Sequence, residues 1–179
     1  MVVSDRTLRM YHSVDGGVTW TQRGNSIVDP AHGNHPTKSS EARFSKAISI
    51  SANGLVVLAA TEPVMFSGTN AQVLCYEWNG SVWTGNVVYE FGPGGRFSAV
   101  ISADGKVCLF VGGRRLYRYT KNVSGIWTLA AVTYIGFPWV TTLELTYDMW
   151  NIISTSADGT FVSLTVPGNS GGVEIFRWN

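Results

Sequence analysis

The sequence predicts an all-β protein built from repeated four-stranded antiparallel sheets, and two repeated elements carry this prediction. The first is a tight turn in residues 49–54 (SISANG), 100–105 (VISADG) and 154–159 (STSADG), whose glycines recur about every fifty residues. Asn-Gly and Asp-Gly favour hairpins because both turn positions accept positive φ. A β-rich run follows each turn, and no helical period of useful length interrupts the pattern.

The second repeated element is an aromatic strand, a turn and then Trp-Thr. It is complete in residues 8–21, 73–84 and 116–128, and it begins again in residues 173–179. If the strands of one sheet are called A to D, the chain reads C-D, then A-B-C-D twice, then A-B-C. Equal spacing and matching turns favour radial repetition in a β-propeller over a sandwich with similar hairpins.

We therefore expect a single β-propeller over residues 1–179 that is incomplete, with about three to four blades. The expected divisions are a partial blade at 1–24, blades at 41–91 and 95–134, and a partial blade at 141–179. The last set could borrow a strand from residues 18–23. Open sheet edges invite pairing, so we expect a homo-oligomer or a piece of a longer propeller.

One turn carries a recognisable motif, Ser-x-Asp-x-Gly-x-Thr-Trp, formed by Ser13, Asp15, Gly17, Thr19 and Trp20. It resembles the Asp-box of sialidase-type and sortilin-type propellers. The resemblance implies that the Ser and Asp side chains bond the loop backbone and that the glycine supplies a permissive φ. It also implies that the tryptophan packs between neighbouring sheets. These residues are expected to hold the fold and to do no chemistry.

The later repeats resemble blades of the FG-GAP type. Residues 44–54 follow the strand pattern of that group with Ser for Gly and Asn for Asp, whereas the third copy departs from it. Some members of the group bind calcium through an Asp-rich loop. No such loop occurs in this sequence, so calcium does not carry over, and we expect no cofactor.

Composition narrows the classes of partner. Charged residues make up 14% of the chain, against about a quarter in ordinary globular proteins, and the net charge is +1. We therefore expect no nucleic-acid partner. No apolar run approaches the ~20 residues of a membrane span, and the start lacks an apolar signal segment. The compartment stays open. Cys75 and Cys108 lie in apolar runs and are expected to be free buried thiols, with one disulfide as the alternative.

The candidate ligand-binding residues lie on predicted loops at one face of the propeller. They are aromatic, apolar or arginine side chains, which favour binding when they cluster on a surface. They are Met65, Phe66, Arg114, Arg115, Phe137 and Trp139. The alternative is that these side chains cover the ends of the core. His32 and His35 lack nearby Cys or acidic partners, so we expect a solvated loop there and no metal site.

The function predicted from these features is a non-enzymatic interaction or assembly module. Its partner would be a protein or a glycan, bound through the loops or the open blade edges, and a structural subunit of a larger assembly fits the same class. The enzymatic alternative is a sialidase-like glycoside hydrolase. Those enzymes share an early Arg-Ile-Pro, which this chain lacks. Paired carboxylates placed for acid–base catalysis are not evident either.

Overall fold

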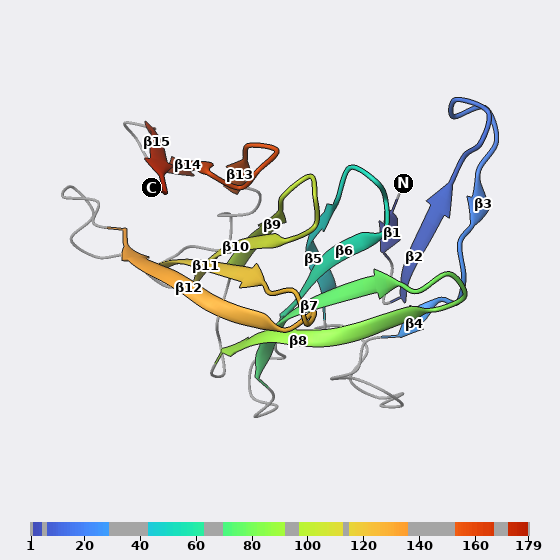
Figure 1. Ribbon diagram of the computed structural model, residues 1–179, viewed down its shortest axis with the longest axis horizontal. Coiled ribbons are helices and arrows are strands. Elements are labelled where there is room, and N and C mark those ends of the chain that lie inside the picture. The colour runs from blue at the N-terminus through green and yellow to red at the C-terminus, as the bar shows by residue number, and fades with distance from the viewer. Residues whose placement is uncertain are drawn as a thin grey trace.

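The computed structural model of the chain is all-β. It describes residues 2–4, 7–28, 43–62, 70–91, 97–112, 115–135, 153–166 and 172–178. These residues form fifteen strands, which pair into four antiparallel sheets (Figure 1). The predicted all-β class is therefore confirmed.

The first sheet contains β1 (Val2–Ser4), β2 (Thr7–His12), β3 (Thr21–Gln22) and β4 (Ile27–Val28). β2 lies in the middle, with β1 on one edge and both β3 and β4 on the other, because β3 and β4 pair with opposite ends of β2. The sequence predicted only the β2–β3 hairpin, and placed the end of this set at residue 24. Two short strands were missed because runs of two or three residues carry no measurable periodicity.

The second and third sheets each have four strands in chain order. The second contains β5 (Arg43–Ile50), β6 (Val56–Glu62), β7 (Ala71–Trp78) and β8 (Trp83–Phe91). The third contains β9 (Phe97–Ile101), β10 (Val107–Gly112), β11 (Arg115–Lys121) and β12 (Trp127–Tyr134). Both are antiparallel meanders of the predicted A-B-C-D kind.

The fourth sheet has three strands in the described residues, β13 (Ile153–Thr155), β14 (Phe161–Val166) and β15 (Gly172–Arg177). It matches the predicted A-B-C set. The beginning of the predicted partial blade, residues 141–152, lies outside the described part of the chain. β3, which lies in the residues 18–23 that could have supplied this sheet with a further strand, pairs with β2.

The sheets are arranged as a fan. The leading strands of consecutive sheets lie side by side, β1 next to β5, β5 next to β9 and β9 next to β13. The first and fourth sheets lie at opposite ends of this arrangement (Figure 1). The residues described therefore form an open array and not a closed ring.

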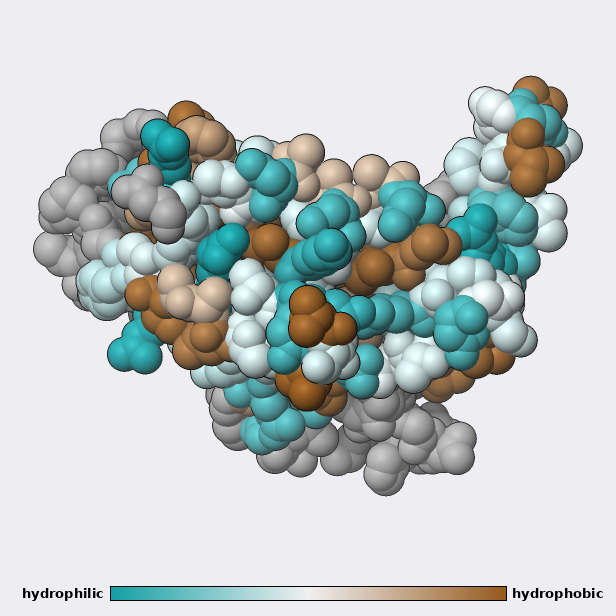
Figure 2. Space-filling view, viewed as in Figure 1, coloured by the Kyte–Doolittle hydropathy of each residue, from teal (hydrophilic) through white to brown (hydrophobic). Residues whose placement is uncertain are grey.

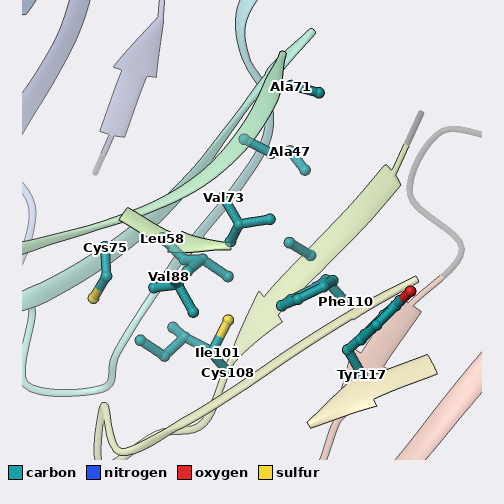
Figure 3. Close-up of a cluster of buried hydrophobic side chains, with 12 residues drawn as sticks. Ala47, Leu58, Ala71, Val73, Cys75, Val88, Ile101, Cys108, Phe110 and Tyr117 are labelled. Carbon is teal, nitrogen blue, oxygen red and sulfur yellow. The ribbon is translucent and has the colours of Figure 1, made fainter. Parts of the chain in front are cut away.

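Three apolar clusters fill the spaces between consecutive sheets. The middle cluster joins the second and third sheets and includes Leu58, Cys75, Cys108 and Phe110 (Figure 3). Successive residues of a strand point to opposite faces. Cys108 and Phe110 therefore face the second sheet, and Leu109 faces the fourth. Burial on both faces explains the continuous apolar run of β10.

Both cysteines are free and buried, as predicted. Burial and the nearby Glu77 carboxylate raise the pKa of the Cys75 thiol to about 12. Burial also raises the pKa of Cys108 well above its usual value. Both groups are therefore neutral thiols at physiological pH and pack as small apolar side chains.

Candidate functional site

Arg115 is the one predicted ligand-binding residue within the described part of the chain. It is exposed, begins β11, and pairs with Gly112 on one side and Tyr134 on the other. The other predicted ligand-binding residues are Met65, Phe66, Arg114, Phe137 and Trp139, and they lie outside the described residues, as do His32 and His35. Their grouping on one face therefore stays a prediction.

Aromatic side chains pack close to Arg115, between the second and third sheets. The ring centroid of Tyr89 lies 5.2 Å from that of Tyr117, and the ring of Phe110 stacks on Tyr117 at 5.0 Å. Burial and the neighbouring Tyr117 raise the pKa of Tyr89. Phe110 is fully buried in the middle cluster, so these rings extend the core to the loop end of the sheets.

A polar group lies at the same end of the second sheet. The side-chain amides of Asn70 and Gln72 both donate hydrogen bonds to the Glu90 carboxylate. These two bonds lower the pKa of Glu90. A carboxylate held in its ionised form by amide donors is poorly suited to act as a general acid.

The Asp-box-like turn is held by its own side chains. The Ser13 hydroxyl accepts the Gly17 N–H at 2.8 Å, and the Asp15 carboxylate accepts the Thr19 N–H at 2.9 Å. Hydrogen bonds from Ser13 and Thr19 hold the pKa of Asp15 well below its usual range. Gly17 has a φ of 96°, which L-residues with a Cβ rarely adopt. The local bonding implied by the motif is therefore present.

The position of Trp20 differs from the expectation. Its side chain is 45% exposed, and its indole N–H donates to the Gly17 carbonyl of the same turn at 3.0 Å. The β2–β3 hairpin projects beyond the sheets (Figure 1), and the exposed side chains of Val14 and Val18 give its tip an apolar surface (Figure 2). Trp20 therefore packs on its own turn and not between sheets.

The repeated Ser-Ala-Asx-Gly turns share one internal hydrogen-bond pattern. In each turn the serine hydroxyl donates to the side-chain oxygen of the Asx residue, which also accepts a backbone N–H two residues later. The serine oxygen accepts the N–H five residues along. The Ser–Asx distances are 2.7 Å for Ser51–Asn53, and 2.6 Å for both Ser102–Asp104 and Ser156–Asp158.

These turns also connect one sheet to the next. The Ala52 N–H donates to the Ala103 carbonyl, and the Ala103 N–H donates to the Ala157 carbonyl, both at 2.8 Å. Each bond joins the same position of consecutive repeats. The three turns therefore form a hydrogen-bonded ladder that runs across the second, third and fourth sheets.

Each glycine after the first packs on the preceding sheet. A Cβ on Gly105 would lie 2.7 Å from Val56 Cγ2, and a Cβ on Gly159 would lie 2.7 Å from Val107 Cβ. No real Cβ makes so close a contact, so only glycine permits this packing. Gly54 has no such neighbour, since its Cβ would first meet the Arg23 guanidinium at 3.9 Å.

The outer side of the fourth sheet is open. Phe161 is 46% exposed, and Val173 and Ile175 are 65% and 72% exposed. The side chains on this side alternate along β14 and β15 and face one another in cross-strand pairs. We call this surface the terminal face, and its residues are Phe161, Ser163, Thr165, Val173, Ile175 and Arg177.

Equivalent positions in the third sheet are covered. Register places Phe161 at the position of Val107, two residues after the turn glycine, and Val173 at the position of Leu116. Val107 and Leu116 are 7% and 0% exposed because the fourth sheet packs on them. On the terminal face the Arg177 guanidinium lies 5.6 Å above the Phe161 ring and covers only part of it.

No group of three His, Cys, Asp or Glu side chains suited to a metal ion occurs among the residues described. In the described part of the chain, no helix is long and apolar enough to cross a membrane.

The sequence did not single out the terminal face. Its alternating pattern was visible in residues 161–165, but a strand pattern does not say which side lacks a neighbouring sheet.

No protein-family model matches the chain, and no curated protein gives a match. Solved structures resemble it at low identity. A 6-phosphogluconolactonase-like protein from Bacteroides uniformis aligns with 99% of this chain at 14% identity and a TM-score of 0.50. A protein of unknown function from Desulfotomaculum acetoxidans aligns with 96% at 12% identity and 0.54. TolB from Acinetobacter baumannii aligns with 95% at 16% identity and 0.47.

These neighbours are longer than this chain. The chain covers 52% of the Bacteroides protein, 48% of the Desulfotomaculum protein and 37% of TolB. The Bacteroides protein has a propeller-type fold, and identities this low bear on fold alone. The four sheets are thus similar to part of a propeller-type fold, while the residues described form no closed ring.

Proposed function

We propose that this chain is a non-enzymatic assembly module that docks another β-sheet on its terminal face. The observation that carries the proposal is the exposure of Phe161 and Val173, at positions where Val107 and Leu116 are buried. Exposed apolar surface on a regular sheet is typical of a protein contact. The partner class is therefore protein, bound by burial of this face.

The chemistry of the terminal face suits packing against a sheet. Its apolar side chains lie in two rows, Phe161 on β14 and Val173 with Ile175 on β15. Each of them pairs across the strands with a polar side chain, namely Arg177, Thr165 and Ser163, and Arg177 is the one charged residue among the six. Stacked sheets pack about 10 Å apart through such interdigitating rows. Burial of three apolar side chains stabilises a contact by roughly 1.5–3 kcal/mol each at most.

A non-enzymatic role is supported by the groups that the structure brings together. Glu90 is held ionised by two amides, and the Asp15 carboxylate is occupied by the bonds of its own turn. With a fluorogenic sialoside we expect no turnover by residues 1–179. Turnover that disappears in Arg115→Ala would instead establish the glycosidase alternative.

Native mass tests the proposed contact. Residues 1–179 are expected to self-associate with increasing concentration in light scattering after size exclusion, because an uncovered apolar face finds a partner of any available kind. The double variant Val173→Thr, Ile175→Ser is expected to remain monomeric with an unchanged circular dichroism spectrum. Val14→Ser, which removes an 89% exposed valine from the hairpin tip, is the matched control and should associate like the original chain. A monomeric original chain at every concentration would contradict the proposal.

A further inference from the structure

We infer that the sheet that covers the terminal face carries its own Ser-Ala-Asx-Gly turn, so that it continues the ladder of turns. This inference rests on the proposed function and names the chemistry of the partner. It follows from three features of the last turn, each of which differs from the corresponding feature of the two earlier turns.

The first feature is the end of the hydrogen-bonded ladder. Ala52 and Ala103 donate their N–H groups to the alanine carbonyl of the following turn. Ala157 occupies the same position and has no acceptor for its N–H among the residues described. If the spacing of the earlier turns is repeated, this N–H points to the place where the alanine carbonyl of a further turn would lie.

The second feature is that no turn glycine of a following sheet packs over Phe161 among the residues described. Val56 and Val107 each lie beneath the glycine of the next turn, at contacts too close for a Cβ. Phe161 follows its own turn glycine by the same two residues and is 46% exposed. A turn glycine brings backbone onto this ring, whereas a side chain at that position would hold the next sheet away.

The third feature is the burial of the turn serines. Ser51 and Ser102 are 2% and 0% exposed, because the following sheet packs on their turns. Ser156 makes the same bonds yet remains partly exposed. All three features would be resolved together by one further sheet of the same repeat.

A second copy of this chain does not supply these groups through its own open end. Its first sheet begins with β1, and the residues described there contain no Ser-Ala-Asx-Gly turn. Head-to-tail docking would therefore not continue the ladder with a turn of the same kind, and would bring Arg9 of β2 towards the side that carries Arg177. A single added strand would pair along the edge of β15 and leave the face itself open.

The chain offers its own probe for a test. Trp178 is equivalent to Lys121, since both donate their N–H to the residue that follows the turn glycine, Thr160 at 3.0 Å and Lys106 at 2.9 Å. Residues 122–179 can therefore be appended after Trp178 in register. The extended protein supplies the fourth sheet with a fourth strand, and then a further sheet with a complete turn. The matched control carries Gly159→Val in the appended copy alone.

The readout is hydrogen exchange of the original Ala157 amide by NMR. We expect this amide to exchange about tenfold more slowly or better in the extended protein than in residues 1–179, as for a newly formed buried hydrogen bond. The Gly159→Val control should exchange like residues 1–179. Equal protection of Ala157 in the extended protein and in its Gly159→Val control would overturn the inference, because the turn glycine would then not be needed for the added sheet to dock.

The remaining outcomes separate this inference from the proposed function. An appended segment that leaves Ala157 unprotected overturns the inference, whether or not that segment folds. If Val173→Thr, Ile175→Ser still abolishes self-association in that case, the terminal face remains a contact surface whose partner is a second copy or an unrelated protein. If it does not, the proposed function fails as well.

Discussion

Gly105 lies directly over Val56, so close that a Cβ on the glycine would come within 2.7 Å of Val56 Cγ2. Fifty-odd residues later Gly159 lies in the same way over Val107. These two contacts fix how near one sheet can approach the next. The repeat is thus encoded in a packing distance as well as in a turn.

The first prediction compares two glycines in equivalent turns. Gly54 and Gly105 have similar positive φ values of 67° and 72°, but only Gly105 packs on a neighbouring sheet too closely for a Cβ. Gly54→Ala should therefore cost about 1–2 kcal/mol, from backbone strain alone. Gly105→Ala should cost about 1–3 kcal/mol more, from overpacking against Val56. Urea denaturation measures both, and equal losses would show that the sheets do not pack as described.

The second prediction concerns acid. Hydrogen bonds from Ser156 and Thr160 hold the pKa of Asp158 well below its ordinary value of 3.8. A carboxyl depressed in this way stabilises the fold above its unfolded pKa, and the contribution is lost as the pH falls from about 4 towards the folded value. Asp158→Asn should keep the turn, because Asn53 makes the same bonds with its amide oxygen. Between about pH 4 and pH 2, the melting temperature of this variant should fall less than that of the original protein.

The check on this prediction is a series of melting curves for both proteins across that pH range. Part of the slope will remain in Asp158→Asn, since the Asp15 pKa is depressed by similar bonds. An unchanged slope would mean that Asp158 does not bond its turn in solution. A variant already destabilised at pH 7 would mean that the charge, and not only the oxygen, is needed.

The third prediction separates two tryptophans at equivalent repeat positions. The Trp83 indole N–H donates to the Arg23 carbonyl at 2.7 Å and so ties the second sheet to the first. Trp83→Phe should cost about 1–3 kcal/mol, because this carbonyl loses its partner in a partly buried site. Trp20→Phe loses only an exposed bond within its own turn, and should cost about 0.5 kcal/mol or less. Similar losses in thermal denaturation would contradict the difference in their surroundings.

The fourth prediction concerns the thiols. Cys75 and Cys108 are buried, and the pKa of each is raised, that of Cys75 to about 12. Because the thiolate is the reactive form, neither should react with iodoacetamide at pH 8 in the folded protein. Both should react fully in denaturant, as counted by mass spectrometry. Prompt modification of either thiol under native conditions would show that the middle cluster opens.

Much of the fold could be predicted because its signals are local. The serine, Asx and glycine of each turn bond one another within a few residues, so the pattern of residues 51–54, 102–105 and 156–159 is visible without a neighbour. The alternating and continuous apolar runs likewise predicted the strands of the second and third sheets. Their all-β, antiparallel character needed no information from distant residues.

The rest depends on contacts between sheets, which sequence patterns do not contain. Trp20 and Trp83 share a motif position, yet only Trp83 has a sheet beside it, so Trp83 is 6% exposed and Trp20 is 45% exposed. The terminal face was missed for the same reason. Phe161 and Val107 occupy equivalent positions in the repeat, and only the structure shows that no neighbouring sheet packs on Phe161. The ligand-binding role predicted for the loop residues is untested, and Arg115 alone among them lies within the residues described.

The most direct measurement is amide hydrogen exchange at the three turn alanines of residues 1–179, at a dilution where the chain is monomeric. Slow exchange at Ala52 and Ala103 with fast exchange at Ala157 is the expected result, because the first two amides donate across sheets and the third faces an open side. Protection of Ala157 equal to that of Ala103 in the monomer would contradict an open terminal face. Fast exchange at all three would contradict the ladder itself.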